Sequence, residues 1–116
     1  MGLRLGSWKT VTIAKDGTAS SETDLGDVFR NVQVYSPAID NATLTVKVSR
    51  LTTETAVQAY TMDDDATGDF ANTSTTKTTA AMNVFKDICA RYITLVLSAA
   101  QSTAARTFYV RGIDML

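Results

Sequence analysis

Apolar and polar residues alternate along several short stretches of the chain. In Ala42 to Arg50 (ATLTVKVSR), Leu44, Val46 and Val48 fall on one side of an extended chain, and Thr, Lys and Ser residues fall on the other. Successive side chains of a β-strand point to opposite faces of the sheet, so a period of two predicts a strand with one buried face. This stretch is the clearest strand prediction in the sequence.

Seven further stretches predict strands from alternation or from β-branched composition. They are Trp8 to Ala14, Glu22 to Leu25, Phe29 to Tyr35, Ala56 to Met62, Ser74 to Val84, Tyr92 to Leu97 and Thr107 to Ile113. Asp16-Gly17 closes the first of them, and Pro37 stands in the turn that joins Phe29 to Tyr35 with the next strand. The nearly continuous apolar run Tyr92 to Leu97 is typical of a central strand covered on both faces.

One segment also fits a helix, because Ala81 to Arg91 places Met82, Phe85 and Cys89 at positions i, i+3 and i+7. We prefer a strand and a loop here, with one helical turn around Phe85 to Cys89. Short strands spaced by roughly 8 to 15 residues are typical of all-β proteins. The sequence therefore predicts an antiparallel β-sandwich, jelly-roll-like, with about eight short strands.

Composition narrows the possible functions. The chain has 116 residues and a net charge of −1, without a block of Lys or Arg that could bind a nucleic acid backbone. No apolar run approaches the ~20 residues of a membrane-spanning helix. The chain contains no histidine, which disfavours hydrolytic triads and zinc sites. It also lacks the GxGxxG and GxxxxGKS/T patterns of nucleotide-binding loops. We expect no cofactor, no nucleic acid or membrane partner, and no enzymatic activity.

Cysteine content and the N-terminus suggest where the protein is made. The single cysteine, Cys89, has no partner for an intramolecular disulfide, and we expect it to be a small buried hydrophobic residue rather than a nucleophile. The N-terminal MGLRLGSWK lacks the apolar core of a signal peptide. Both features favour a reducing compartment.

The acidic stretch TMDDDATGDF (Thr61 to Phe70) raises the alternative of a metal site. An EF-hand loop needs a Gly at position 6 and a bidentate Glu at position 12. Counting from Asp63, Gly68 falls at position 6, but position 12 is Ser74. We therefore interpret the stretch as a solvated connection between strands, without a metal.

Four aromatic residues could form a stacking platform for sugars: Trp8, Tyr35, Tyr60 and Tyr109. We prefer packing in the core or at sheet edges, because aromatic residues in strands usually pack there. Trp8 ends an arm, MGLRLGSW, whose apolar residues would be exposed unless a neighbouring subunit covers them. We accordingly divide the chain into an N-terminal arm, residues 1–8, and one β-sandwich domain, residues 9–116.

Three stretches that cover most of the chain follow one another in a recognisable order. They are VTIAKDGTASSETDLGDVFRNVQVYSPAIDNATLTVKVS, the apolar strand ARYITLVL and the final strand RTFYVRGI. In this order they resemble a group of small structural proteins of tailed bacteriophages. The acidic insert is longer than in the pattern of this group. The resemblance implies a β-sandwich virion protein that decorates or cements the capsid shell, without catalytic residues. It further implies the major capsid protein as a partner, a homotrimer at three-fold positions of the shell, and a location on the capsid surface after synthesis in the host cytoplasm.

The chain ends supply the contacts that we expect, because apolar termini gain from docking and otherwise fray. The predicted interface residues are Leu3, Arg4, Leu5, Trp8, Ile113, Met115 and Leu116. Two alternatives remain. A carbohydrate-binding or attachment module on a phage head or tail would use the aromatic residues and the loop from Asp63 to Asp69, which recognises hydroxyls or holds calcium. An enzyme could use Asp65 and Asp69 as acid and base, and we disfavour it because a flexible loop holds their separation poorly.

Overall fold

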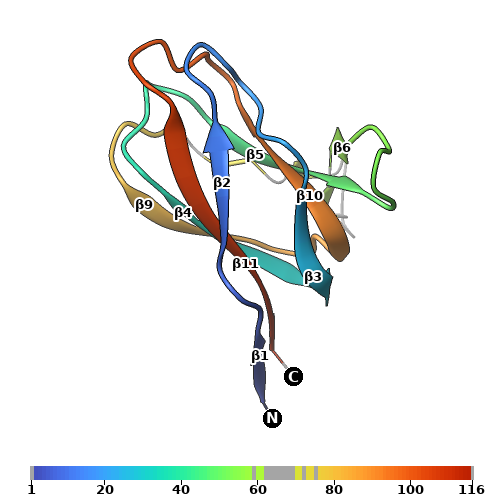
Figure 1. Ribbon diagram of the computed structural model, residues 1–116. Coiled ribbons are helices and arrows are strands. Elements are labelled where there is room, and N and C mark those ends of the chain that lie inside the picture. Colours follow the sequence, from blue (N-terminus) through green and yellow to red (C-terminus); the bar gives the residue numbers. More distant parts are fainter. Residues whose placement is uncertain (1, 59, 62–69, 72, 75, 116) are drawn as a thin grey trace.

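The computed structural model describes residues 2–58, 60–61, 70–71, 73–74 and 76–115, which form two main antiparallel sheets (Figure 1). The five-stranded sheet contains β1 (Leu3–Leu5), β2 (Lys9–Ile13), β4 (Asn31–Ser36), β9 (Ala81–Phe85) and β11 (Arg106–Met115). The four-stranded sheet contains β3 (Thr23–Phe29), β5 (Leu44–Ser49), β6 (Val57–Gln58) and β10 (Ala90–Leu97). A small separate pair consists of β7 (Tyr60–Thr61) and β8 (Phe70–Ala71). In these ranges no residue is helical, and there is accordingly no helix that could span a membrane.

The strand order confirms a jelly-roll-like sandwich. β1 and β2 both pair with β11, so the sheets read β1/β2-β11-β4-β9 and β3-β10-β5-β6. Consecutive strands change sheet at almost every step: β2 to β3, β3 to β4, β4 to β5, β9 to β10 and β10 to β11. Such crossing connections between two antiparallel sheets distinguish a jelly roll from a pair of simple meanders.

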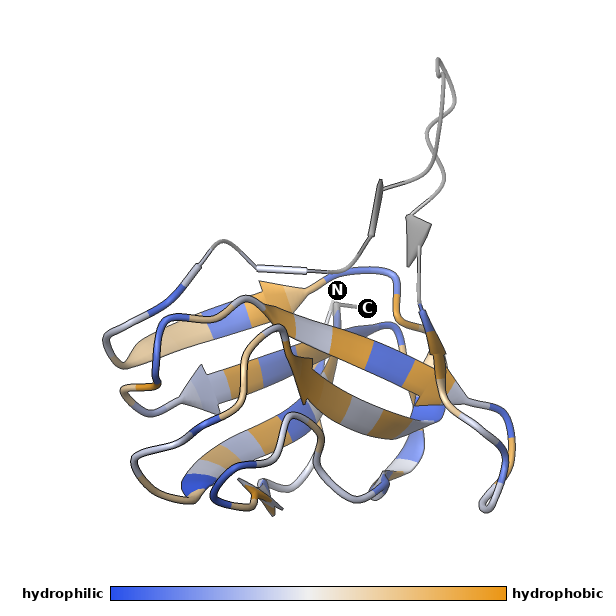
Figure 2. Cartoon of the chain, turned by 90° about the horizontal axis from the view of Figure 1, so that it is seen from above, coloured by the Kyte–Doolittle hydropathy of each residue, from blue (hydrophilic) through white to orange (hydrophobic). Residues whose placement is uncertain are grey.

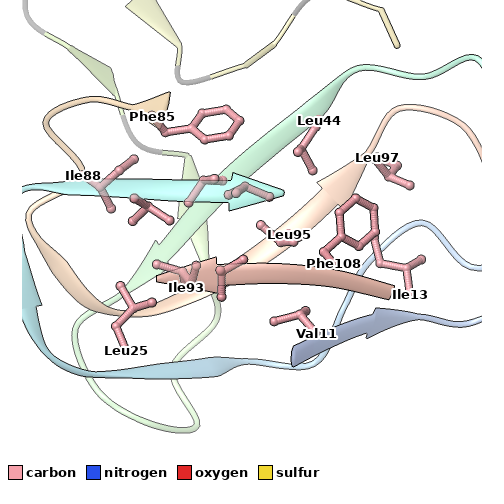
Figure 3. Close-up of a cluster of buried hydrophobic side chains, with 14 of the residues drawn as sticks. Val11, Ile13, Leu25, Leu44, Phe85, Ile88, Ile93, Leu95, Leu97 and Phe108 are labelled. Carbon is pink, nitrogen blue, oxygen red and sulfur yellow. The ribbon is translucent and has the colours of Figure 1, made fainter. Parts of the chain in front are cut away.

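The core lies between the sheets and is built from the inward positions of the alternating strands. Figure 3 shows labelled side chains of both sheets pointing toward one another, with Phe108 and Ile13 facing Leu95 and Leu97. The bands of hydrophobic and hydrophilic residues along the strands in Figure 2 follow the same alternation. The core residues are Val11, Ile13, Leu25, Phe29, Val32, Val34, Ile39, Ala42, Leu44, Val46, Phe85, Ile88, Ile93, Leu95, Leu97, Phe108 and Val110.

Most predicted strands are confirmed, with one correction to burial. Ala42 to Arg50 contains β5, Trp8 to Ala14 contains β2, and Thr107 to Ile113 lies within β11. β10 is central in its sheet, between β3 and β5, but only one of its faces is in the core. Its other face is half-buried, so the prediction of two covered faces is wrong.

The segment between β3 and β5 differs from the prediction in two ways. β3 was predicted to end at Leu25, but it continues to Phe29. It can do so because Gly26 adopts a φ of 92° and the chain remains paired with β10 after a register shift. Phe29 therefore belongs to the four-stranded sheet, and Arg30 separates it from β4. The turn that contains Pro37 then crosses from one sheet to the other.

The alternative helix over Ala81 to Arg91 is wrong. β9 ends at Phe85, and the turn that follows contains Asp87 and Cys89 with φ values of 56° and 51°. The amides of Ile88 and Cys89 donate hydrogen bonds to the Arg30 carbonyl oxygen, at 2.7 and 3.3 Å. Positive φ values turn the chain away from a right-handed helix, so the single helical turn predicted around Phe85 to Cys89 is also absent from these described residues.

Cys89 is a second correction, because its side chain is exposed and not buried. The residue occupies the left-handed region of the turn between β9 and β10, outside the alternation that places side chains in the core. Composition alone suggested a small hydrophobic core residue. The backbone conformation of the turn instead places the Cys89 side chain at the surface.

Candidate interaction surface

The outer face of the five-stranded sheet carries a row of exposed apolar side chains. Tyr109 of β11 is the register partner of Tyr35 in β4, and Tyr35 is the partner of Met82 in β9. Trp8 lies directly before β2, at the edge of the same sheet. These four side chains are 39 to 51% exposed and line an open groove of about 300 Å³. We call this set the aromatic groove.

Neighbouring side chains hold the aromatic groove in place. The rings of Tyr35 and Tyr109 have centroids 6.1 Å apart and are tilted by 52°, an arrangement that aromatic pairs favour. The guanidinium carbon of Arg111 lies 4.4 Å from the centroid of the Trp8 ring. Arg111 also donates a 2.7 Å hydrogen bond from Nε to Oε1 of Gln33. No described carboxylate pairs with Arg111, so a positive charge borders an apolar groove without local neutralisation.

The N-terminal residues form a two-stranded ribbon with the end of β11 (Figure 1). Leu3, Arg4 and Leu5 are the register partners of Met115, Asp114 and Ile113. The amide of Gly6 extends this pairing with a 2.8 Å hydrogen bond to the Gly112 carbonyl oxygen. This terminal ribbon thus attaches β1 along the same strand that carries Tyr109 and Arg111.

Arg4 anchors the terminal ribbon to the four-stranded sheet. Its guanidinium donates to the Asp114 carboxylate, to Oδ2 of Asp27 at 2.8 Å and to the Val28 carbonyl oxygen at 2.7 Å. Its guanidinium carbon also lies 4.3 Å from the centroid of the Phe29 ring. A hydrogen bond from the Arg30 amide, together with Arg4, lowers the pKa of Asp114, and the bond to Asp114 raises the pKa of Arg4. Both groups are therefore charged at neutral pH.

The alternation in β1 leaves Leu3 and Leu5 on the side opposite Arg4. Their side chains are 57 and 49% exposed, whereas Arg4 points toward β3. Ile113, the partner of Leu5, is half-buried and follows Tyr109 and Arg111 at two-residue steps in β11. The leucines of the terminal ribbon thus extend the apolar outer face beyond the aromatic groove.

The predicted interface residues therefore separate into two groups. Leu3, Arg4, Leu5 and Ile113 come together in the terminal ribbon, and the backbone of Met115 pairs there with Leu3. Trp8 instead joins the aromatic groove. Leu116 and the loop from Asp63 to Asp69, which includes Asp65, lie outside the described residues.

The preferred packing of the aromatic residues, in the core or at sheet edges, is wrong for Tyr35 and Tyr109. Both are exposed and lie on central strands of their sheet. Trp8 is exposed at the sheet edge. Tyr60 contributes its backbone to β7. Sequence reasoning did not identify Met82, Val84 and Arg111, although each falls at an outward position of its alternating strand.

The outer face of the four-stranded sheet is polar by comparison. Thr45, Lys47 and Thr94 occupy outward positions there, together with the half-buried Tyr92 and Val96. Oγ1 of Thr45 lies 2.8 Å from Oγ1 of Thr73. At the β3 edge, Asp24 accepts hydrogen bonds of 2.8 and 3.0 Å from Arg91. This contact, with the Gly26 amide, lowers the pKa of Asp24 to about 2.

A second groove of about 210 Å³ lies beside the exposed Cys89. Its lining mixes apolar residues such as Val28 and Val57 with Arg50, which forms a 2.6 Å ion pair with Glu54. The residues that the structure describes contain no cluster of His, Cys, Asp or Glu that could hold a metal ion. The aromatic groove and the terminal ribbon are therefore the better candidates for binding.

Comparison of the chain with protein-family models, curated proteins and solved structures finds no match. The candidate site is accordingly interpreted from its own residues.

Proposed function

We propose that this chain is a structural virion protein of a tailed bacteriophage that decorates and cements the capsid shell through protein–protein contacts. The observation that carries the proposal is the set of exposed apolar and aromatic side chains on the outer face of one sheet, from Leu3 and Leu5 to Met82, with Arg111 among them. The resemblance of three sequence stretches to phage structural proteins supplies the biological setting. The proposal assigns no catalytic activity and no cofactor to the chain.

The chemistry of the aromatic groove suits adhesion. Trp, Tyr and Arg are the residues that most often dominate binding energy at protein interfaces, and Trp8, Tyr109 and Arg111 occur here side by side. Exposed apolar patches of this kind mark interaction sites in soluble proteins. A cement protein needs only such contacts, since an interface of standard size, ~1,600 Å² in total, is tight when a few anchors are well desolvated.

The proposed partners are the major capsid protein and two further copies of the chain. The aromatic groove would contact the capsid, while the terminal ribbon, with Leu3, Leu5 and Ile113, would contact neighbouring copies in a homotrimer. A closed trimer matches a three-fold position of the shell with three copies of one interface. The protein would then be made in the host cytoplasm and reside on the capsid surface.

A sedimentation assay with expanded heads of the encoding phage tests this proposal. The double variant Tyr35→Ser/Tyr109→Ser should bind heads at least ~10-fold more weakly, because it removes both rings from the groove. The matched control Thr45→Ser/Thr94→Ser changes the outer face of the other sheet and should bind as the wild type does. Unchanged sedimentation of the tyrosine variant would overturn the proposal.

Carbohydrate binding is the second candidate function, and the exposure of Trp8, Tyr35 and Tyr109 around one groove favours it. Aromatic faces stack on sugar rings, and Gln33 and Arg111 could hydrogen-bond to hydroxyl groups. A glycan array tests this function. Binding to a defined glycan that is lost in Trp8→Ala and retained in Thr94→Ser, without binding to heads, would replace the capsid proposal with an attachment module.

A further inference from the structure

β9 forms a regular and uncharged edge of the five-stranded sheet. All five of its residues pair with β4, from Ala81 opposite Ser36 to Phe85 opposite Val32, without a register shift. Its sequence, AMNVF, contains no charged residue, Pro or Gly. Among the described residues no strand pairs with its other edge. Unpaired backbone N–H and C=O groups on such an edge can accept another strand.

The other sheet edges carry features that oppose strand addition. β3 contains a register shift, Gly26 with a positive φ, and the charged residues Asp24 and Asp27. β6 is only two residues long. The β1/β2 edge is interrupted between Leu5 and Lys9. Natural proteins use short strands, charges and bulges to prevent edge pairing, so their absence from β9 distinguishes this edge.

Asn83, at the centre of β9, lies between two outward apolar residues and has its own side chain on the inner side of the strand. Its Nδ2 is buried and has no hydrogen-bond partner among the described residues. On either side of it, Met82 and Val84 are exposed by 51 and 48%. Exposed apolar side chains on an unpaired strand gain free energy when a second strand covers them.

We propose that a second copy of this chain pairs with β9 in antiparallel orientation, with the two-fold axis at Asn83. In this register Met82 lies opposite Val84 of the second copy, and Val84 lies opposite Met82 of the second copy. Both pairs of outward side chains are therefore apolar. The two Asn83 residues lie opposite each other, with their side chains on the inner side of the joined sheet. A two-fold contact requires a self-complementary surface, and the sequence of β9 provides one.

Charge and position are compatible with this pairing. Lys86, the nearest charged residue after β9, would lie opposite the uncharged Ala80 of the second copy, so the register brings no like charges together. The contact joins two five-stranded sheets into one continuous sheet. It uses the edge opposite β1, so it leaves the terminal ribbon free and does not depend on the proposed virion function.

The mass of the assembled protein in solution tests the contact. Sedimentation velocity of the wild type should show an assembly that the variant Val84→Lys divides in two, with self-association at least tenfold weaker, because the two lysines would face apolar partners on one edge. Thr107→Lys adds the same charge at an exposed position of central strand β11 and should keep the wild-type mass. A mass unaffected by Val84→Lys would overturn the proposal. A monomeric wild type would also overturn it and would leave the edge to an extended segment of another protein.

A cysteine cross-link tests the register. Residues directly opposite each other in an antiparallel pair have Cα atoms about 4.5 to 5.5 Å apart, within the range that a disulfide spans. Asn83→Cys, made in a Cys89→Ser chain, should form a covalent dimer on mild oxidation, and Thr107→Cys in the same background should not. Circular dichroism verifies that both variants are folded. Failure of the folded Asn83→Cys chain to cross-link above the Thr107→Cys level would refute the pairing at Asn83.

Discussion

The two sheets present similar inner faces and very different outer faces. Inside, both contribute aliphatic residues to one core, with Val110 of β11 and Leu95 of β10 as examples. Outside, the five-stranded sheet exposes Tyr35 and Tyr109. The four-stranded sheet presents threonines, a lysine and the ion pair of Asp24 with Arg91, and its outward Tyr92 and Val96 are half-buried. The inner faces are explained by folding alone. The aromatic outer face is not, because exposed rings add little to the stability of a single chain.

The two outer faces differ in what they gain from contact with another molecule. A face of threonines and paired charges is well solvated, and its polar groups already have partners, as Thr45 has in Thr73. A face of aromatic residues gains free energy only when another surface covers it. In the proposed function, the five-stranded sheet contacts other molecules and the four-stranded sheet supports it from behind.

The largest expected effect comes from a substitution at a contact between the two sheets, on which both outer faces depend. Gly112 of β11 contacts the ring of Phe29 from β3, and a Cβ at this position would lie 2.0 Å from two of its ring carbons. Gly112→Ala should lower the free energy of unfolding by about 3 kcal/mol, because the overpacked core must shift. Chemical denaturation measures the change.

Gly26→Ala is the matched control for that substitution. Nothing lies within 4 Å of a Cβ at Gly26, but its φ is +92°. The substitution should therefore cost only about 1 kcal/mol, from backbone strain. Equal costs at the two glycines would contradict a tight contact between Phe29 and Gly112.

An effect of intermediate size on the free energy of unfolding should come from a substitution on the aromatic outer face, and a smaller one from a substitution on the polar outer face. Tyr109→Thr removes the cross-strand ring contact with Tyr35 and retains a residue with high β propensity. We expect a loss of about 0.5 to 1 kcal/mol in the free energy of unfolding. Thr94→Ser, on the outer face of β10, should stay within about 0.5 kcal/mol of the wild type. A larger loss of stability in Thr94→Ser than in Tyr109→Thr would mean that the aromatic groove is no more structured than the polar face.

Acid should affect the polar side of the molecule. The pKa of Asp24 is lowered from 3.8 to about 2 by the Arg91 side chain and the Gly26 amide, so the folded state binds this proton more weakly than the unfolded state does. The stabilisation is complete above the unfolded value of 3.8 and is lost as the pH falls through about 2. The contribution is small, because the Asp24 side chain is 46% exposed.

Thermal unfolding followed from pH 6 to pH 2 measures this contribution. The Tm of the wild type should fall more steeply over this range than that of Asp24→Asn, which carries no titrating group at the site. Parallel curves for the two proteins would exclude Asp24 as a source of acid sensitivity.

The smallest effect should be local to the terminal ribbon. Arg4→Ala removes the contacts that attach β1 to Asp114, Asp27 and the Val28 carbonyl oxygen. Amide hydrogen exchange of Leu5 and Gly6 should become faster, while the Tm of the whole protein stays close to that of the wild type. Lys15→Ala, in the exposed turn after β2, should leave both unchanged. Protection of β1 that persists in Arg4→Ala would show that backbone pairing alone holds the ribbon.

Alternation in the sequence was sufficient to predict the sandwich, because period two identifies a half-buried strand without knowledge of its neighbours. β2, β5 and β11 were found on that basis, with Val11, Val46 and Phe108 on their buried sides. Where backbone conformation overrides the pattern, prediction failed. The positive φ of Gly26 lets β3 continue, and that of Cys89 turns a presumed core residue outward.

The candidate site was only partly predictable, because it depends on which strands become neighbours. Tyr35 and Tyr109 lie 74 positions apart in the sequence, and their contact arises from the register of β4 with β11. Met82 joins them only because β9 is a strand and not a helix. The outward positions of Tyr35 and Tyr109 could be identified from the alternation of each strand separately. The residues beside them on neighbouring strands could not be identified, because the sequence does not show which strands pair.

The side-by-side position of the chain ends also determines how the molecule would respond to force. Leu3 pairs with Met115, so a pull applied to both ends would open the β1–β11 ribbon from its tip, one residue pair at a time. Unzipping of this kind needs little tension, because the bonds break in sequence and not together. The sandwich would first bear load at the bond between Gly6 and Gly112. The terminal ribbon would thus open at a lower force than the rest of the sandwich.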